Sequence, residues 1–336
     1  MKTFLLDKSI ALRKLPVNYE IKHKIFFEQD FKKEINETYI SEFKNVLVTS
    51  EGIAYNKFHI IKESLLTPEH YKIFNLRYLL STLIKGKGIS LTNEEYLLPF
   101  NFWYKGYFHW ITETLPRLYI IKEKLREYVL LLPEDLCKFH LDSIAPFNFK
   151  NIFLIPGKNY VKIENLILPS HTAPTGNYNE FLINKVREFY LDFFKTNISI
   201  KTSKRIYISR AKAARRQIEN EEQVKTLLKN KGFDIIYFEE LTFAEQLLIS
   251  NNADIMLGLH GAGLTNMLFM KPGTNVFELR FENDSHNLCY FSLASALNLN
   301  YYYQFCNTAE KGMDTHTGNI NVDLEALEKN IDLIIK

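Results

Sequence analysis

The clearest hydrophobic pattern lies in the second half of the chain, where short apolar runs alternate with amphipathic segments. The runs predict buried strands at RIYIS (205–209), DIIYF (234–238), DIMLG (254–258) and NVFEL (275–279). Helices are expected between them, because Asn220 with Gln223 and Thr242 with Glu245 are typical of capping boxes, and Gly232 ends the first helix. Strand and helix in alternation predict an α/β fold with a parallel sheet, which binds ligands beyond the carboxyl ends of its strands.

The first half shows shorter runs of the same kind. They predict strands at 19–27, 45–50, 129–132, 151–155 and 165–168. A turn-rich break at 171–178 precedes a helix with one apolar stripe through Leu182, Val186, Phe189 and Phe193. We therefore expect two domains, residues 1–175 and 176–336. The last helix, from Asp323, is expected to pack back on the first domain.

Composition excludes several function classes. Hydrophobic residues make up 46% of the 336 residues, and the net charge of +3 gives no basic face for a nucleic-acid partner. Three separated cysteines without a CxxC argue against a disulfide framework or a zinc site. The N-terminus has too short an apolar run before Asp7 for a signal peptide or a spanning helix. A cytoplasmic protein is the expectation, with peripheral contact at the inner face of a membrane left open.

The strongest motif is GLHGAGLTN (258–266), which follows a strand and precedes a helix. The backbone N–H groups of Gly261, Ala262 and Gly263 are expected to point out of the helix N-terminus, where an anion is favoured. Thr265 and Asn266 can add hydrogen bonds. A tight turn that needs glycine for geometry alone is the alternative. An esterase oxyanion turn is excluded because the chain has no G-x-S-x-G.

Two further clusters carry candidate chemistry. Arg210 follows a strand on the ligand side of the sheet, with Arg215 and Arg216 in the next loop, and guanidinium groups suit diphosphate. A solvated basic loop is the alternative.

His109 and Glu113 are four apart and share a helix face, which Arg117 continues if Pro116 only kinks the helix. Either residue of the pair can serve as a general base, and an ordinary surface ion pair is the alternative. His171 has no partner at ligand spacing, which favours a structural or surface role. The absence of D-x-D, Walker A and HExxH motifs predicts no metal and no cofactor.

The segments FHWITETLPRL, RIYISR…RQIENEEQV and LTFAEQ…ADIMLGLHGAGLTNMLFMKPGTNVFEL together resemble glycosyltransferase family 61 across residues 98–280. That family includes bacterial capsule and lipopolysaccharide enzymes and eukaryotic xylosyl- and N-acetylglucosaminyltransferases. The resemblance implies a GT-B architecture, with two Rossmann-like domains facing a cleft. It also implies an inverting, metal-independent reaction.

The resemblance further implies roles for particular residues. Glu278 would contact the ribose hydroxyls, and Arg117 would face the acceptor with His109 and Glu113. The donor would be bound by the remaining set: Arg210, Arg216, Asn220, His260, Gly261, Ala262, Gly263, Leu264, Thr265 and Asn266.

The expected function is transfer of a sugar, from UDP by analogy with the family, to an oligosaccharide or glycolipid hydroxyl in surface polysaccharide biosynthesis. A sugar-nucleotide epimerase, a capsule phosphotransferase and a non-catalytic nucleotide-sugar-binding module are the alternatives.

Overall fold

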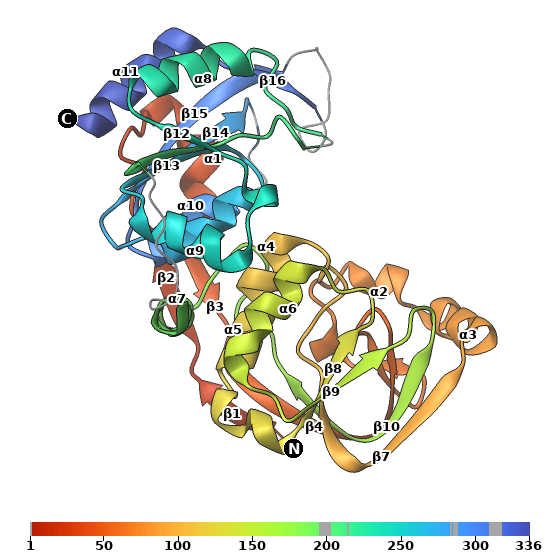
Figure 1. Ribbon diagram of the computed structural model, residues 1–336. Coiled ribbons are helices and arrows are strands. Elements are labelled where there is room, and N and C mark those ends of the chain that lie inside the picture. The colour runs from red at the N-terminus through yellow and green to blue at the C-terminus, as the bar shows by residue number, and fades with distance from the viewer. Residues whose placement is uncertain (1, 195–202, 214, 283, 285–287, 309–317) are drawn as a thin grey trace. The chain divides into compact units, whose positions relative to one another are not determined.

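The computed structural model describes residues 2–194, 203–213, 215–282, 284, 288–308 and 318–336, and the chain divides into two compact units (Figure 1). The first unit consists of residues 1–10 and 34–182, and the second of residues 11–33 and 183–336. The main boundary therefore falls at 182/183, where the sequence indicates 175/176. Residues 11–33, which the sequence pattern leaves with the first domain, belong to the second unit.

A mixed sheet forms the first unit, with strand order β6-β5-β4-β10-β7-β8-β9 and β1 paired with β4. Its strands are β1 (Lys2–Leu6), β4 (Thr38–Thr49), β5 (Ala54–Asn56), β6 (His59–Ile60), β7 (Gly88–Leu97), β8 (Val129–Pro133), β9 (Asn151–Ile155) and β10 (Tyr160–Pro169). Four of the strands predicted in this half coincide with β4, β8, β9 and β10 or parts of them. Strands β7 and β10 run parallel and in register at their ends, so the segments that follow Leu97 and Pro169 leave the sheet at the same edge.

The helices of this unit are short. They are α2 (His70–Ile73), α3 (Leu76–Lys85), α4 (Tyr107–His109), α5 (Leu115–Tyr119) and α6 (Lys138–Ile144). Asn75 caps α3, because its side-chain oxygen accepts from the amides of Arg77 and Tyr78. Leu79 of α3 packs with Tyr55 and Phe74 in a small buried cluster. This cluster holds α3 against the sheet near β5.

The second unit contains a sheet of order β12-β11-β13-β14-β15-β16. Its strands are β11 (Arg205–Ile208), β12 (Asp234–Ile236), β13 (Ile255–Leu259), β14 (Asn275–Phe281), β15 (Asn300–Thr308) and β16 (Ile320–Asn321). Adjacent strands in the series β12-β11-β13-β14-β15 are parallel, and β16 is antiparallel to β15. All four predicted strands are present, which confirms the α/β class.

Helices connect and cover these strands: α1 (Lys24–Phe27), α7 (Glu180–Phe194), α8 (Glu221–Asn230), α9 (Phe243–Asn252), α10 (Cys289–Ala296) and α11 (Leu324–Ile335). The predicted capping box of Thr242 and Glu245 opens α9, and Gly232 at φ +78° follows α8. Strands β2 (Ser9–Leu12) and β3 (Lys32–Ile35) pair with each other, and the unit boundaries at 10/11 and 33/34 fall inside them.

Two predictions about the ends of the chain are wrong. The last helix, α11, does not leave its own unit: Leu327 and Ile331 are buried with Val224 and Leu228 of α8 in the core of the second sheet. Burial of this apolar stripe against α8 makes a partner in the first unit unnecessary.

The strand predicted for residues 19–27 is helical instead. Strand β16 pairs with β15 only at Asn307 and Thr308. Beside the earlier part of β15, the Val17 amide donates to the Tyr301 carbonyl, and the Asn18 side chain bonds both backbone groups of Tyr303. The helical turns that follow pack on the sheet through their side chains. Phe27 is buried against Phe291 and Tyr303. Ile21 and Ile25, which complete the alternating pattern, are exposed.

In the part of the chain that the structure describes, every helix is too short or too polar to cross a bilayer.

Candidate functional site

The first candidate site is carried by a continuous helical segment in the first unit. Its opening turn is α4, a π-helical stretch follows at Trp110–Thr114, and α5 completes it. Proline lacks an N–H and clashes with the preceding turn, and the π-helical stretch stands immediately before Pro116 of α5. The segment therefore continues through the proline, as the sequence analysis required for one shared face.

Glu113 lies at the centre of a polar cluster. His109 Nδ1 is 3.0 Å from Glu113 Oε1, which also accepts from Thr175 Oγ1 at 2.7 Å. Asn101 Nδ2 donates to the other oxygen, Oε2, at 2.9 Å. The side chain of Glu113 is 7% exposed, and that of His109 is 24% exposed. The carboxylate is therefore held on both oxygens, while the imidazole is the more accessible member of the pair.

Aromatic and histidine rings surround this pair. Trp103 lies 4.6 Å from the His109 ring and 5.0 Å from the His70 ring, measured between centroids. His171 follows β10, and neither of its ring nitrogens has a protein partner in the described part of the chain, although both are buried. Burial lowers the pKa of His171, and the nearby Arg117 cation lowers it further. His171 is therefore neutral at pH 7, inside the unit rather than on its surface.

Sequence reasoning missed Asn101, Thr175 and His70 in this cluster. Asn101 and Thr175 lie 12 and 62 residues from Glu113, so no helical or strand period connects them. Only their positions could have indicated a role, because each residue follows the carboxyl end of a parallel strand, where ligands bind in such sheets.

Arg117 does not lie where a substrate could touch it. Its guanidinium is fully buried and donates to the carbonyl groups of Leu98, Pro99, Phe100 and Pro169. These carbonyls belong to the two segments that leave β7 and β10. We correct the expected substrate contact: Arg117 joins the two segments, and its buried position follows from their unpaired carbonyl groups.

The second candidate site is the turn after β13 in the second unit. A 3-10 helix, Ala262–Phe269, follows Gly261. A Cβ atom at Gly261 would lie 2.3 Å from Arg210 Nη1, and one at Gly263 would lie 2.9 Å from Ile208 Cγ2. Gly263 therefore allows the turn to approach β11 closely, and the end of the Arg210 side chain packs directly on Gly261.

Three residues of the motif have a different role from the expected one. Leu264, Thr265 and Asn266 are buried, and Asn266 donates to the Gln246 side chain and the Gly263 carbonyl. Their side chains fix the 3-10 helix to the core. The ligand-facing part of the motif is thus reduced to the turn at 260–263.

Arg210 and Arg216 bring two positive groups to this turn. Arg210 donates from Nε to the Arg216 carbonyl and from Nη2 to the Arg215 carbonyl, both at 2.9 Å. Burial lowers the pKa of Arg210, and the neighbouring Arg216 cation lowers it further. Among the described residues neither guanidinium has a carboxylate at ion-pair distance, and Arg216 Nε is buried without a hydrogen-bond partner. Two uncompensated cations beside small residues are suited to an anion.

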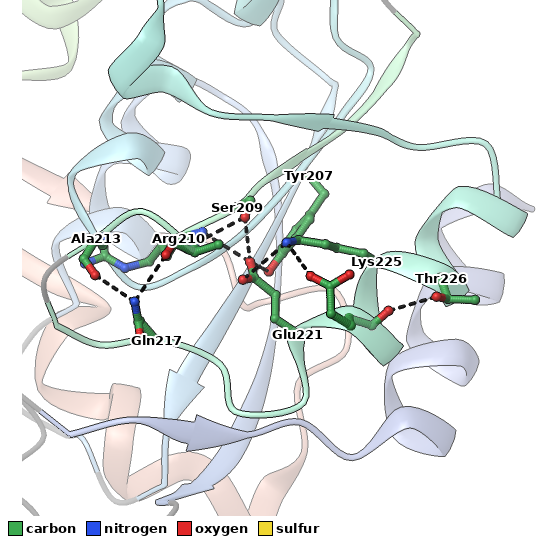
Figure 2. A network of polar contacts seen from close by, with 10 residues as sticks. Tyr207, Ser209, Arg210, Ala213, Gln217, Glu221, Lys225 and Thr226 are labelled. Carbon is green, nitrogen blue, oxygen red and sulfur yellow. Dashed lines mark hydrogen bonds and ion pairs between the residues drawn. The ribbon is translucent and has the colours of Figure 1, made fainter.

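Glu221 at the start of α8 positions Arg210 (Figure 2). Its Oε1 accepts from Tyr207 Oη at 2.8 Å, from Ser209 Oγ at 2.7 Å and from the Arg210 amide at 3.2 Å. These three donors belong to the end of β11 and the residues just after it. The carboxylate therefore fastens the end of β11 to α8 and fixes the point from which Arg210 extends.

Asn220 neither caps α8 with its side chain nor faces a ligand. Its Nδ2 donates to the Val322 carbonyl and its Oδ1 accepts from the Val322 amide. Neither the predicted helix cap nor the predicted donor contact is present, because both polar atoms of the Asn220 side chain are bonded to the backbone of Val322.

Glu278 is also placed differently from the expectation of a ribose contact. It is fully buried, and its oxygens meet His260 Nδ1 at 2.5 Å, Arg280 Nη1 at 3.2 Å and Tyr301 Oη at 2.5 Å. Burial by itself raises the pKa of Glu278, but Arg280 and His260 outweigh burial and leave the pKa below its ordinary value. The expected ribose contact is corrected: Glu278 holds His260, the first residue of the turn.

No cluster of three or more His, Cys, Asp or Glu residues suited to a metal ion occurs in the described ranges. The candidate sites consist of imidazole, carboxylate and guanidinium groups with glycine backbone.

Comparison with known proteins identifies the family of the chain. A family model described as Glycosyltransferase 61 matches residues 107–277, just over half of the chain. The chain is also similar to the EGF domain-specific O-linked N-acetylglucosamine transferases of Drosophila melanogaster, Gallus gallus and Mus musculus. It is 36% identical to the first over 97 residues, 40% to the second over 92 and 31% to the third over 154.

These matches cover 28%, 26% and 44% of this chain, and 18%, 17% and 28% of the three relatives. The chain thus spans less than a third of the length of the relatives it matches.

The buried Glu278 network generates a stability prediction. Glu278→Gln removes the nearer of the two carboxylates paired with the buried Arg280 cation, and Asp284 remains at 3.6 Å. Because charge-assisted hydrogen bonds are lost, we expect a loss of about 1.5–3 kcal/mol in the free energy of unfolding at pH 7. Because the pKa of Glu278 is lowered in the folded state, its contribution is present above the ordinary value of 4.5 and is lost as the pH falls below it. Urea denaturation of both proteins across this range measures the effect.

The exposed Glu325 supplies the control, since Glu325→Gln changes the same group with little expected effect. A Glu278→Gln protein as stable as this control at pH 7 would contradict the assigned role.

Proposed function

Because the chain belongs to the glycosyltransferase 61 family and is a glycosyltransferase, we propose that it transfers a sugar from UDP to a glycan hydroxyl with inversion at the anomeric carbon. The family implies a nucleotide-sugar donor and a glycan acceptor. It favours sugar transfer over the epimerase, the phosphotransferase and the binding module.

The observation that carries the proposal is the packing of Arg210 on Gly261, beside Arg216. A sugar diphosphate presents two phosphates, and guanidinium groups bind such oxygens in pairs. The small residues Gly261, Ala262 and Gly263 leave room for a phosphate, and a helix start of this kind favours an anion. We assign the donor diphosphate to this turn.

The His109–Glu113 pair is proposed to act on the acceptor. Both oxygens of Glu113 are occupied by Thr175, Asn101 and His109, whereas His109 is the more exposed of the two. Since His109 turns Nδ1 to the carboxylate, Nε2 is the nitrogen that can take a proton from a hydroxyl. We therefore propose His109 as the general base and Glu113 as the residue that orients it.

The proposed reaction is one displacement. The acceptor oxygen forms a bond to the anomeric carbon as the bond from that carbon to the donor phosphate breaks. The hydroxyl proton passes to His109 Nε2, and the electron pair leaves with the nucleoside diphosphate. The arginines and the turn amides stabilise the negative charge that develops on the leaving group.

The wider setting is part of the same proposal. We propose a GT-B arrangement of the two units, independence from metal ions, and a role in surface polysaccharide biosynthesis on the cytoplasmic side of a membrane. The name of the relatives specifies an EGF domain as acceptor. Their overlap with this chain is short, so the proposed acceptor here remains an oligosaccharide or glycolipid.

A nucleotide panel tests the function. Bound donor stabilises the folded state by mass action, so UDP-sugars should raise the melting temperature more than GDP- or CMP-sugars. Release of UDP should depend on an acceptor glycan. A protein that no nucleotide sugar stabilises, or that interconverts the sugar without an acceptor, would contradict the assignment.

Arg210→Ala should lower kcat/KM by about 10²-fold, comparable with loss of one preorganised donor to a developing anion. Arg205 at the opposite end of β11 provides a matched control, because Arg205→Ala removes the same group far from the turn. Steady-state kinetics of both variants distinguishes a donor contact from a general loss of charge. Equal rates for the two variants would exclude Arg210 from diphosphate binding.

His109→Ala should lower kcat by about 10²- to 10⁴-fold, the usual contribution of general acid–base catalysis. Glu113→Gln, which keeps a hydrogen-bonding group beside His109, should cost less. Rates at saturating donor measure both changes. The reverse order, with Glu113→Gln the more damaging, would make Glu113 the base.

A further inference from the structure

A cavity of about 440 Å³ lies in the first unit, between α3 and the face of the sheet that carries β4, β10 and β7. Residues 90–92 of β7 and 162–164 of β10 line it, in the first halves of these strands. The Glu113 cluster lies beyond the opposite, carboxyl ends of the same strands. The cavity therefore belongs to neither candidate site described above.

The walls of the cavity are mainly apolar. Its apolar lining includes Leu79 and Leu83 of α3 and Leu47 and Tyr55 of the sheet. The volume is within the usual range for small-molecule sites, about 300–1,000 Å³. A cavity of this size with leucine walls is suited to a hydrocarbon chain rather than to a sugar.

A strained turn lies at the mouth of the cavity. Lys57 and Phe58 connect β5 to β6, and their φ angles of +46° and +67° are in the left-handed region without a glycine. Such turns favour Asn or Gly, and a bulky residue there costs free energy. Phe58 is also 63% exposed. The left-handed angles close the β5–β6 hairpin at a cost in backbone free energy and leave the Phe58 ring exposed beside the cavity, an arrangement that occurs at binding sites.

The charges at the mouth are mostly positive. Lys57 and Lys162 line the cavity together with one carboxylate, Glu164. Neither lysine forms an ion pair with any residue that the structure describes. Arg77 and Lys85 on α3 are exposed as well. This distribution complements an anionic head group.

The outer face of α3 carries an exposed apolar stripe. Leu76, Leu80 and Ile84 are spaced four apart and are 53%, 45% and 82% exposed. A helix with an apolar stripe flanked by basic residues is typical of binding in the plane of a membrane surface. Figure 1 shows α3 at a margin of the first unit.

We propose that α3 and the Lys57–Phe58 turn dock the protein on an anionic lipid bilayer, and that the cavity beneath α3 takes up one acyl chain of a lipid. The apolar stripe enters the interface, and the basic residues contact the head groups. This surface is independent of the donor and acceptor sites.

Vesicle sedimentation tests the docking surface. We expect the full-length protein to sediment with vesicles of equal parts phosphatidylglycerol and phosphatidylcholine, less with phosphatidylcholine alone, and less as salt increases. The double substitution Leu80→Ser and Ile84→Ser should weaken binding at least about tenfold. Leu141→Ser, an exposed leucine of the same unit, is the matched control and should bind as the wild-type protein does.

Calorimetry with monomeric dodecyl phosphate tests the cavity. We expect one molecule to bind per chain, and Leu83→Trp, which fills the cavity, to abolish binding. Ser90→Phe fills it from the sheet side and answers the same question if Leu83→Trp does not fold.

Absence of sedimentation with anionic vesicles, or sedimentation unaffected by the double substitution, would overturn the docking surface. Dodecyl phosphate binding that survives both cavity variants would overturn the acyl-chain site. Neither readout involves sugar transfer, so failure here is distinguishable from failure of the proposed function.

Discussion

The geometry of the second unit depends on one buried carboxylate, Glu278. It joins three neighbouring parallel strands, because it meets His260 after β13, Arg280 on its own strand β14 and Tyr301 on β15. Neither Glu278 nor Arg280 is exposed to water, and the Arg280 cation is paired with Glu278 at 3.2 Å and with Asp284 at 3.6 Å, so the buried charges stabilise one another. The glycine turn begins at His260. The position of that turn relative to Arg210 therefore rests on an interaction that no ligand touches.

A carboxylate also holds a histidine in the first unit, but the two histidines differ in their surroundings. There Glu113 holds His109 through Nδ1, as Glu278 holds His260. The difference lies in the direct contacts: Glu278 forms an ion pair with Arg280, whereas the partners of Glu113 besides His109 are the neutral groups of Asn101 and Thr175. His109 is also more exposed than His260. One histidine is thus suited to exchange a proton, and the other to maintain a turn.

The sequence predicted those features that depend on neighbours close along the chain. The alternating apolar runs, the Thr242–Glu245 capping box and the meeting of His109 with Glu113 are all local, and the structure contains them. Roles decided by distant partners were not predictable. Arg117 is buried because carbonyl groups up to 52 residues away need donors, and Asn220 is drawn away from α8 by Val322, 102 residues later. The glycine turn after β13 could be located, but the burial of Leu264, Thr265 and Asn266 could not.

Residues 11–33 belong to the second unit although they precede the whole sheet of the first apart from β1. Their Phe27 and Asn18 are built into the sheet of the second unit around Tyr303. A gene exchange with a single crossover near residue 182 would take residues 11–33 from one parent and residues 183–336 from the other. The sheet of the second unit would then have to pack against an N-terminal segment from a different protein. The two units therefore cannot be exchanged independently by a single crossover. New combinations must arise by divergence of the whole chain, or by exchanges that carry the early segment along.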